Sequence, residues 1–226
     1  MGTNFDGLNI IDVRFGTIPA YRLYKGNTLV WQGLPTEYQK VEYLQSTGTQ
    51  WIDTGVIPDD RTGISMKLSI NDINSDKIRI GCRETSGDTR FWIASIRGIV
   101  YFGFGRNYGV TNDDFKIQSN IPFIAYLNYK NNRTCYVDDY TPLSLDSVSS
   151  ITFTMSMVMF GRKYQSGISC SAQKIYSCQI SQGNELIRDF IPCYRKLDNK
   201  PGMYDLVNNV FYTNDGTEEF IIGDNI

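Results

Sequence analysis

The stretch YQKVEYLQSTGTQWIDTGVIP at residues 38–58 decides the fold, together with IRDFIPCYRKLDNKPGMYDLVNNVFYTNDG at residues 187–216. We call them the opening segment and the closing segment. Both mix aromatic and β-branched residues with Gly, Asn and Asp at turn spacing, which is typical of short strands joined by tight turns. They predict two ends of one all-β domain, and neither contains a catalytic motif.

Predicted hairpins lie within and around these segments. Each has Gly or Asn between two runs of strand formers, and these residues tolerate the positive φ of tight turns. The predicted pairs are residues 20–24 with 28–32 across 25–27, 123–130 with 133–138 across 131–132, 174–180 with 186–191 across 182–184, and 204–207 with 210–213 across 208–209. Antiparallel strands are therefore expected along most of the chain.

Two further stretches predict single strands. ITFTMSM at residues 151–157 alternates apolar and polar side chains and predicts a strand with one buried face. YFGFG at residues 101–105 predicts a strand in which another side chain packs over the missing Cβ atoms. No segment keeps helical periodicity for three turns. The prediction is an all-β fold, an antiparallel β-sandwich or jelly roll.

The chain divides into two predicted domains. A small β-hairpin module at residues 1–33 is expected to serve attachment, and the sandwich is expected to occupy residues 34–226. Gly33, Leu34 and Pro35 form the predicted joint, because proline fixes its own φ and restricts the residue before it. A sandwich of this size is usual for an undivided all-β domain.

Composition excludes several classes of partner. The net charge of −2 and the scattered Lys and Arg residues argue against nucleic acid. The N-terminus has no basic start or long apolar stretch of a secretion signal, and no apolar run is long enough for a bilayer, so we expect cytosolic synthesis without membrane insertion. The five cysteines show no CxxC pair and the chain has no histidine, which favours buried or half-buried free thiols over a zinc site.

Known families share parts of these patterns. With VEYLQSTGTQWIDTG at residues 41–55, LIRDFIPC at 186–193 and GMYDLVNNVFYTNDGT at 202–217, the chain resembles the concanavalin A-like lectin/glucanase superfamily, in the LamG-like branch of gut bacteria and their phages. The resemblance covers about residues 34–223. Asn128 to Asp138 is similar to a hairpin of that branch, although Asp139 stands where the family has glycine.

The N-terminal sequence IIDVRFGTIPAYRLYKGNTLVWQG at residues 10–33 is similar to short β modules at the start of phage structural proteins. Together the two resemblances imply a phage virion protein, a head fibre, decoration protein or tail fibre. Residues 1–33 would attach to other virion proteins, and a lectin-like jelly roll, displayed as a homo-oligomer such as a trimer, would bind a host-surface glycan. The alternative is a bacterial surface carbohydrate-binding protein or a glycanase-derived domain.

The residues predict no enzyme, no catalytic residue and no cofactor. Glycosidases of the superfamily carry Glu-x-Asp-x-x-Glu on one strand, whereas the pairs Glu218-Glu219 and Asp138-Asp139 are adjacent and neighbours on a strand face opposite sides. Without histidine, Ser-His-Asp and Cys-His nucleophile systems are closed as well.

Weaker candidates for binding remain. Asn112-Asp113-Asp114 and Asp138-Asp139 are the richest clusters for calcium, but they lack the spacing of a dedicated loop and are interpreted as solvated turn carboxylates. Four residues are candidates for an apolar sugar platform with polar groups around it: Trp92, Tyr101, Tyr108 and Arg106. Trp51 and Trp92 stand in strand-like contexts that favour core packing, so no binding residue is assigned.

Overall fold

The computed structural model describes residues 3–226 except 6–7, 11–13, 16–17, 20–21, 27, 85–88, 111–114, 129–133, 140–141 and 146–151. In most of residues 3–31 and in residues 107–110 only the backbone is described. The described part of the chain consists of strands and connecting turns and contains no helix, so no helix in it is long and apolar enough to cross a bilayer.

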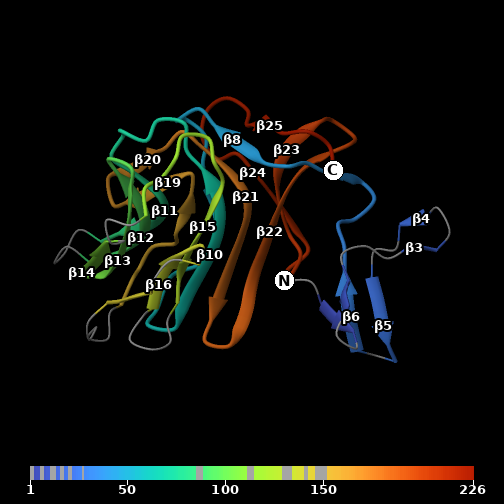
Figure 1. Cartoon of the computed structure of the whole chain (residues 1–226). Coiled ribbons are helices and arrows are strands. Elements are labelled where there is room, and N and C mark those ends of the chain that lie inside the picture. The colour runs from blue at the N-terminus through green and yellow to red at the C-terminus, as the bar shows by residue number, and fades with distance from the viewer. Residues whose placement is uncertain are drawn as a thin grey trace.

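Two antiparallel sheets form the body of the protein (Figure 1). The first sheet has the order β17 (Leu143–Ser144), β16 (Thr134–Val137), β15 (Phe123–Leu127), β10 (Thr62–Ser69), β21 (Gln173–Gln182), β22 (Glu185–Arg195), β23 (Lys200–Asp205) and β24 (Val210–Thr213). At its margin β7 (Tyr38–Lys40) pairs with β22, and β8 (Leu44–Ser46) pairs with β21 and with β25 (Ile221–Ile222).

The second sheet has the order β14 (Asn107–Val110), β13 (Ile99–Gly105), β12 (Arg90–Ile96), β11 (Lys77–Arg83), β18 (Val158–Met159) and β9 (Ile52–Asp53). Two more strands, β19 (Gly161–Tyr164) and β20 (Gly167–Cys170), join it through β11. The pairing of β11 with β19 is parallel, whereas its other pairings are antiparallel. The predicted all-β sandwich is therefore confirmed.

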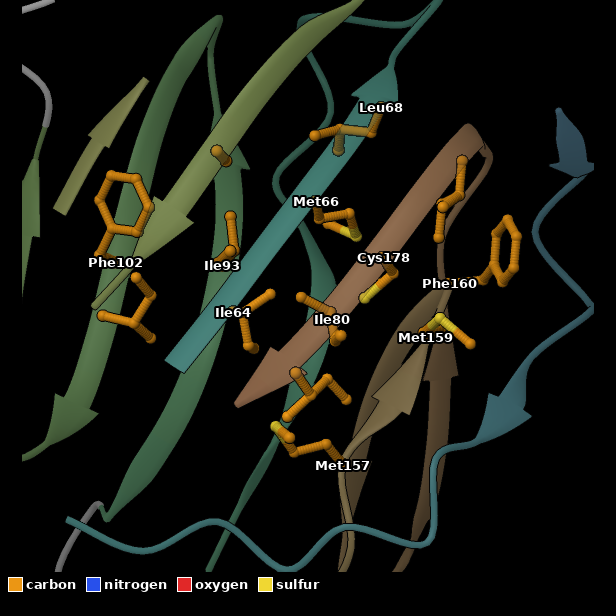
Figure 2. Packing of buried hydrophobic residues seen from close by; sticks show 14 of the residues in the cluster. Ile64, Met66, Leu68, Ile80, Ile93, Phe102, Met157, Met159, Phe160 and Cys178 are labelled. Atoms are coloured by element: carbon orange, nitrogen blue, oxygen red, sulfur yellow. The ribbon is translucent and has the colours of Figure 1, made fainter. Parts of the chain in front are cut away.

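The core lies between the two sheets, and alternate residues of each strand supply it (Figure 2). Ile64, Met66 and Leu68 are buried on β10, while Lys67 between them is exposed. Side chains from both sheets and from β18 surround them: Ile80, Ile93, Phe102, Met157, Met159, Phe160 and Cys178. This period of two is what specifies which face of each sheet is covered.

The predicted hairpins are confirmed where the structure describes them. β5 (Arg22–Lys25) pairs with β6 (Thr28–Gln32), β15 with β16, β21 with β22, and β23 with β24. Gly26 and Gly183 have a φ of +64°, and Asn209 has a φ of +58°, as the turn chemistry requires. The predicted turn at residues 131–132 lies outside the described residues, and β23 ends at Asp205, two residues earlier than predicted.

The strand predicted at residues 151–157 is wrong. Residue 151 is outside the described residues, and residues 152–157 form no strand. The next strand, β18, begins at Val158. The predicted alternation of burial holds in part: Phe153 and Met157 are buried and Thr152 and Thr154 are exposed, whereas Met155 and Ser156 are both half-buried. The backbone bonds of Met157 go to the opening segment, with Thr54 N donating to Met157 O at 3.0 Å, so this stretch is extended without belonging to a ladder.

The opening and closing segments lie side by side although they are far apart in sequence. Trp51 N donates to Asn214 Oδ1 at 3.0 Å, and Asp53 N donates to Asp215 Oδ2 at 3.0 Å. A Cβ atom on Gly216 would lie 2.1 Å from Thr49 O, so only glycine permits this approach. The opening segment and the closing segment thus form one structural unit of the sandwich.

A buried ionic network strengthens the same contact. The Asp205 side chain has no exposed surface and accepts hydrogen bonds from Asp189 N, Val207 N and Asn208 Nδ2. Its Oδ2 atom also lies 3.5 Å from Arg188 Nε, which donates to Thr54 O in the opening segment. The polar residues of the closing segment are therefore occupied in holding the fold.

The N-terminal strands add to neither sheet. β1 (Thr3–Phe5) pairs with β2 (Leu8–Ile10), and β3 (Arg14–Phe15) pairs with β4 (Ile18–Pro19), each as a two-stranded ribbon like the hairpin of β5 and β6. In Figure 1 the hairpin of β5 and β6 lies to one side of the sandwich. At the predicted joint, Gln32 Nε2 donates to Leu206 O and to Asn209 Oδ1, at the turn between β23 and β24.

Candidate functional site

The outer face of the second sheet carries a tryptophan that lies flat on glycine. Phe91 belongs to the core, so its neighbour Trp92 faces outward, and the register places Trp92 between Gly81 on β11 and Gly103 on β13. A Cβ on Gly81 would lie 2.7 Å from Trp92 Cβ, and a Cβ on Gly103 would lie 2.3 Å from Trp92 Nε1. The prediction that a side chain packs over the missing Cβ atoms of residues 101–105 is confirmed at Gly103.

Two arginines cover the exposed side of this ring. The guanidinium carbons of Arg90 and Arg162 lie 4.9 Å and 5.6 Å from the centre of the Trp92 ring, within the range of cation–π attraction. Trp92 is consequently only 8% exposed. Its predicted burial is correct, but it is buried beneath arginines on an outer face and does not belong to the cluster between the sheets.

An open hollow of about 510 Å³ lies next to these arginines. Its described lining consists of Arg83, Glu84, Arg162, Tyr164, Gln165 and Ser166. The parallel pairing of β11 with β19 sets Arg83 opposite Tyr164, and the turn between β19 and β20 adds the last two residues. Residues about eighty positions apart are therefore brought to one place by a single strand pairing.

Arg162 is the most unusual residue of the hollow. Its guanidinium lies 5.1 Å from the centre of the Tyr164 ring as well as over Trp92, and its Nε atom is buried without a hydrogen-bond partner. Burial and the like charge of Arg83 lower the pKa of Arg162 from its ordinary value. Among the described residues, no carboxylate forms an ion pair with it. The site offers a positioned cation to an anionic group.

Glu84 does not serve as that anion, because it holds the backbone beside the hollow. Its Oε1 atom accepts hydrogen bonds from Thr154 N at 2.6 Å and from Thr154 Oγ1 at 3.1 Å. These bonds occupy one carboxylate edge and fix the extended stretch that the sequence predicted as a strand. Glu84 therefore sets the wall of the hollow without neutralising Arg162.

A second groove of about 340 Å³, lined mostly by polar residues, lies at one end of the sandwich. Its lining includes Asn71, Asn120 and Gln173, whose Nε2 atom donates to Arg79 O at 2.8 Å while its Oε1 atom has no partner. Arg79 is 1% exposed and donates to Ser95 Oγ and Ala172 O, and burial lowers its pKa to about 10. This arginine connects the two sheets and is a structural residue.

The candidate sugar platform of the sequence is only partly assembled. Tyr101 shares the outer face with Trp92, since it lies two residues before Gly103 on β13. Arg106 is exposed in the turn after β13, and the register sets Tyr108 opposite Gly103, although the Tyr108 side chain lies outside the described residues. Trp92, Tyr101 and Arg106 are not among the described lining residues of the hollow that contains Arg162.

The candidate calcium clusters have other surroundings. Asp138 adopts a φ of +47° and accepts a hydrogen bond from Ile124 N at 2.7 Å, so its carboxylate closes the hairpin of β15 and β16. Glu219, which belongs to the adjacent pair weighed against the glycosidase motif and not to a calcium cluster, pairs with Lys200. The described residues contain no group of three or more acidic, cysteine or histidine side chains suited to a metal, and residues 112–114 lie outside them.

The cysteines are free thiols, as predicted. All five are free, and Cys170 is half-buried. The other four are buried: Cys82, Cys135, Cys178 and Cys193. Burial raises the pKa of the Cys193 thiol to about 12. These thiols pack as small apolar side chains and are poor nucleophiles.

No protein-family model matches the chain, and no curated protein matches it. The residues that sequence reasoning missed are Arg83, Arg162 and Tyr164, and the alternation of Arg162 and Tyr164 in GRKY at residues 161–164 was the available signal.

Proposed function

We propose that the protein is a non-enzymatic virion component of a bacteriophage, a head fibre, decoration protein or tail fibre, whose sandwich binds a carbohydrate of the host surface. The observation that carries the binding role is the hollow at Arg162, where a guanidinium without a carboxylate partner in the described chain lies within cation–π distance of two aromatic rings. Aromatic faces and planar hydrogen-bond donors are the groups from which sugar-binding sites are built.

The virion role is supported by the two-part organisation. The strands of residues 3–32 add to neither sheet, so a module with its own hairpins precedes the sandwich. The resemblance of residues 10–33 to modules of phage structural proteins supports attachment through this part. Oligomeric display, such as a trimer, would multiply weak single-site contacts, because the first contact raises the effective concentration for the next.

Binding is tested with the full-length chain on an array of bacterial surface polysaccharides. We expect retention of at least one polysaccharide by the unaltered chain and loss of that retention in Arg162→Gln. The matched control is Arg61→Gln, which removes an exposed arginine paired with Asp59 on the other sheet. Absence of binding to every polysaccharide would leave the sandwich as a spacer, and release of reducing sugar ends would identify a glycanase instead.

Attachment is tested on particles. A phage encoding the chain without residues 1–33 should assemble particles that lack the protein, while residues 34–226 remain soluble in the lysate. Immunoblots of purified particles and of the soluble fraction measure both. Incorporation of the shortened chain at the normal level would contradict attachment through residues 1–33.

A further inference from the structure

We infer that the hollow at Arg162 binds the carboxylate of an acidic sugar residue. The inference rests on the proposed carbohydrate-binding function and adds the chemical class of the ligand. It assigns the charge-recognising role to Arg162, with Tyr164 beside it and the polar residues Gln165 and Ser166 at the mouth of the hollow.

The first step is the state of Arg162 without ligand. A guanidinium carries five N–H donors, and here the Nε–H is buried without a hydrogen bond. Leaving a buried donor unsatisfied costs free energy, more so on a charged group. The guanidinium carbon lies within cation–π distance of the Trp92 and Tyr164 rings, which restrict the position of the group before a ligand arrives. A carboxylate that accepts from the terminal N–H groups of this fork would balance the charge, with little ordering left to do.

The second step is the charge of the lining. Arg162 contributes a positive charge that no carboxylate of the described residues pairs with, whereas Arg83 has an interaction of its own and Glu84 is held by Thr154. A single carboxylate balances this charge, whereas a phosphate near two negative charges would face repulsion from Glu84. The bonds from Thr154 hold Glu84 in the wall, so it does not move away to admit a dianion.

The third step is the room for a sugar around the carboxylate. The hollow is open and about 510 Å³ in volume, which is within the usual size of a small-ligand site. The half-buried ring of Tyr164 offers an apolar face, and Gln165 and Ser166 are exposed with groups that can donate to and accept from hydroxyls. An acidic sugar presents all three chemistries that this lining matches.

The experiment compares ligands that differ only in charge. Oligogalacturonate and N-acetylneuraminate are titrated into the full-length chain by calorimetry, each beside its methyl ester, which keeps the sugar and removes the negative charge. We expect at least one acid to bind, with its ester about tenfold weaker or more, which corresponds to about 1.4 kcal/mol. Inorganic phosphate is a separate arm, and we expect it to compete only weakly.

Variants assign the effect to the residue. Arg162→Gln should weaken binding of the acid about tenfold or more and leave the ester unchanged, because only the charged contact is lost. Arg162→Lys keeps the charge without the planar fork and should restore part of the affinity. Arg61→Gln is the control with no expected effect. Unchanged thermal unfolding midpoints show that a loss of binding is not a loss of folding.

The outcomes separate this inference from the proposed function. Equal binding of acid and ester, or an unchanged affinity in Arg162→Gln, overturns the carboxylate inference while carbohydrate binding stands. Binding of phosphate with no binding of either acid also overturns it, in favour of a phosphate site. A lack of binding to acids, esters and neutral polysaccharides overturns both.

Discussion

Replacing Asp205 with alanine should markedly lower the stability of this sandwich. The side chain is fully buried and holds three donors, Asp189 N, Val207 N and Asn208 Nδ2, at 2.8–3.0 Å. With about 1–1.5 kcal/mol for each lost bond, the free energy of unfolding should fall by about 4 kcal/mol. This agrees with the cost of about 3–5 kcal/mol for removing one partner of a buried ion pair, here that of Arg188.

Thermal unfolding followed by circular dichroism measures this loss. A domain of this size changes its midpoint by about 2–4 °C per kcal/mol, so Asp205→Ala should unfold about 8–16 °C below the unaltered chain. The matched control is Asp198→Ala, which removes an exposed partner of Arg195 and should leave the midpoint unchanged. If Asp205→Ala is no less stable than this control, the closing segment does not hold the sandwich in the way described here.

Three further predictions test other parts of the structure. Gly103→Ala places a Cβ 2.3 Å from Trp92 Nε1, so it should lower the free energy of unfolding by about 1–3 kcal/mol and shift the tryptophan emission. An unchanged emission spectrum would contradict the packing of the Trp92 ring against Gly103. In thiol titration of the native protein, Cys170 alone should react, and more slowly than a free thiol because burial raises its pKa. In denaturant all five cysteines should react. Reaction of more than one thiol in the native protein would contradict the burial of the other four. Burial raises the pKa of Asp53, but hydrogen bonds from Lys163 and from the other partners of Asp53 lower this pKa below its ordinary value of 3.8. The Asp53 carboxylate therefore stabilises the fold above pH 3.8, and this stabilisation is lost as the pH falls through the native pKa. Asp53→Asn should therefore show a flatter fall of the urea midpoint below pH 3.8, and an equal slope would refute this.

The hairpins could be predicted from the sequence because their turn chemistry is local. The hairpin of β21 and β22 turns at Gly183, and that of β23 and β24 turns at Asn209, each with positive φ. Residues 152–157 could not be predicted in the same way. Their alternation reports which side chains are buried, whereas the backbone partners come from Val56 and other residues about a hundred positions away.

The candidate site was the least predictable part, for the same reason. Arg162 reaches Trp92 because β19 runs parallel to β11, and this pairing leaves no local signal in the sequence. The orientation of Trp92 was also hidden, since its neighbours Phe91 and Ile93 are apolar and a strand that is apolar on both faces does not reveal which face is outside. By contrast, the most distinctive residues of the sequence, those of the closing segment, form hydrogen bonds that hold the sandwich together.

A crystal structure of the full-length chain with a bound acidic oligosaccharide tests the central claim most directly. The account predicts sugar density in the hollow beside Tyr164, with a carboxylate oxygen within hydrogen-bond distance of the Arg162 guanidinium. Sugar density confined to the polar groove at Gln173, or an empty hollow in crystals saturated with a ligand that binds in solution, would contradict it.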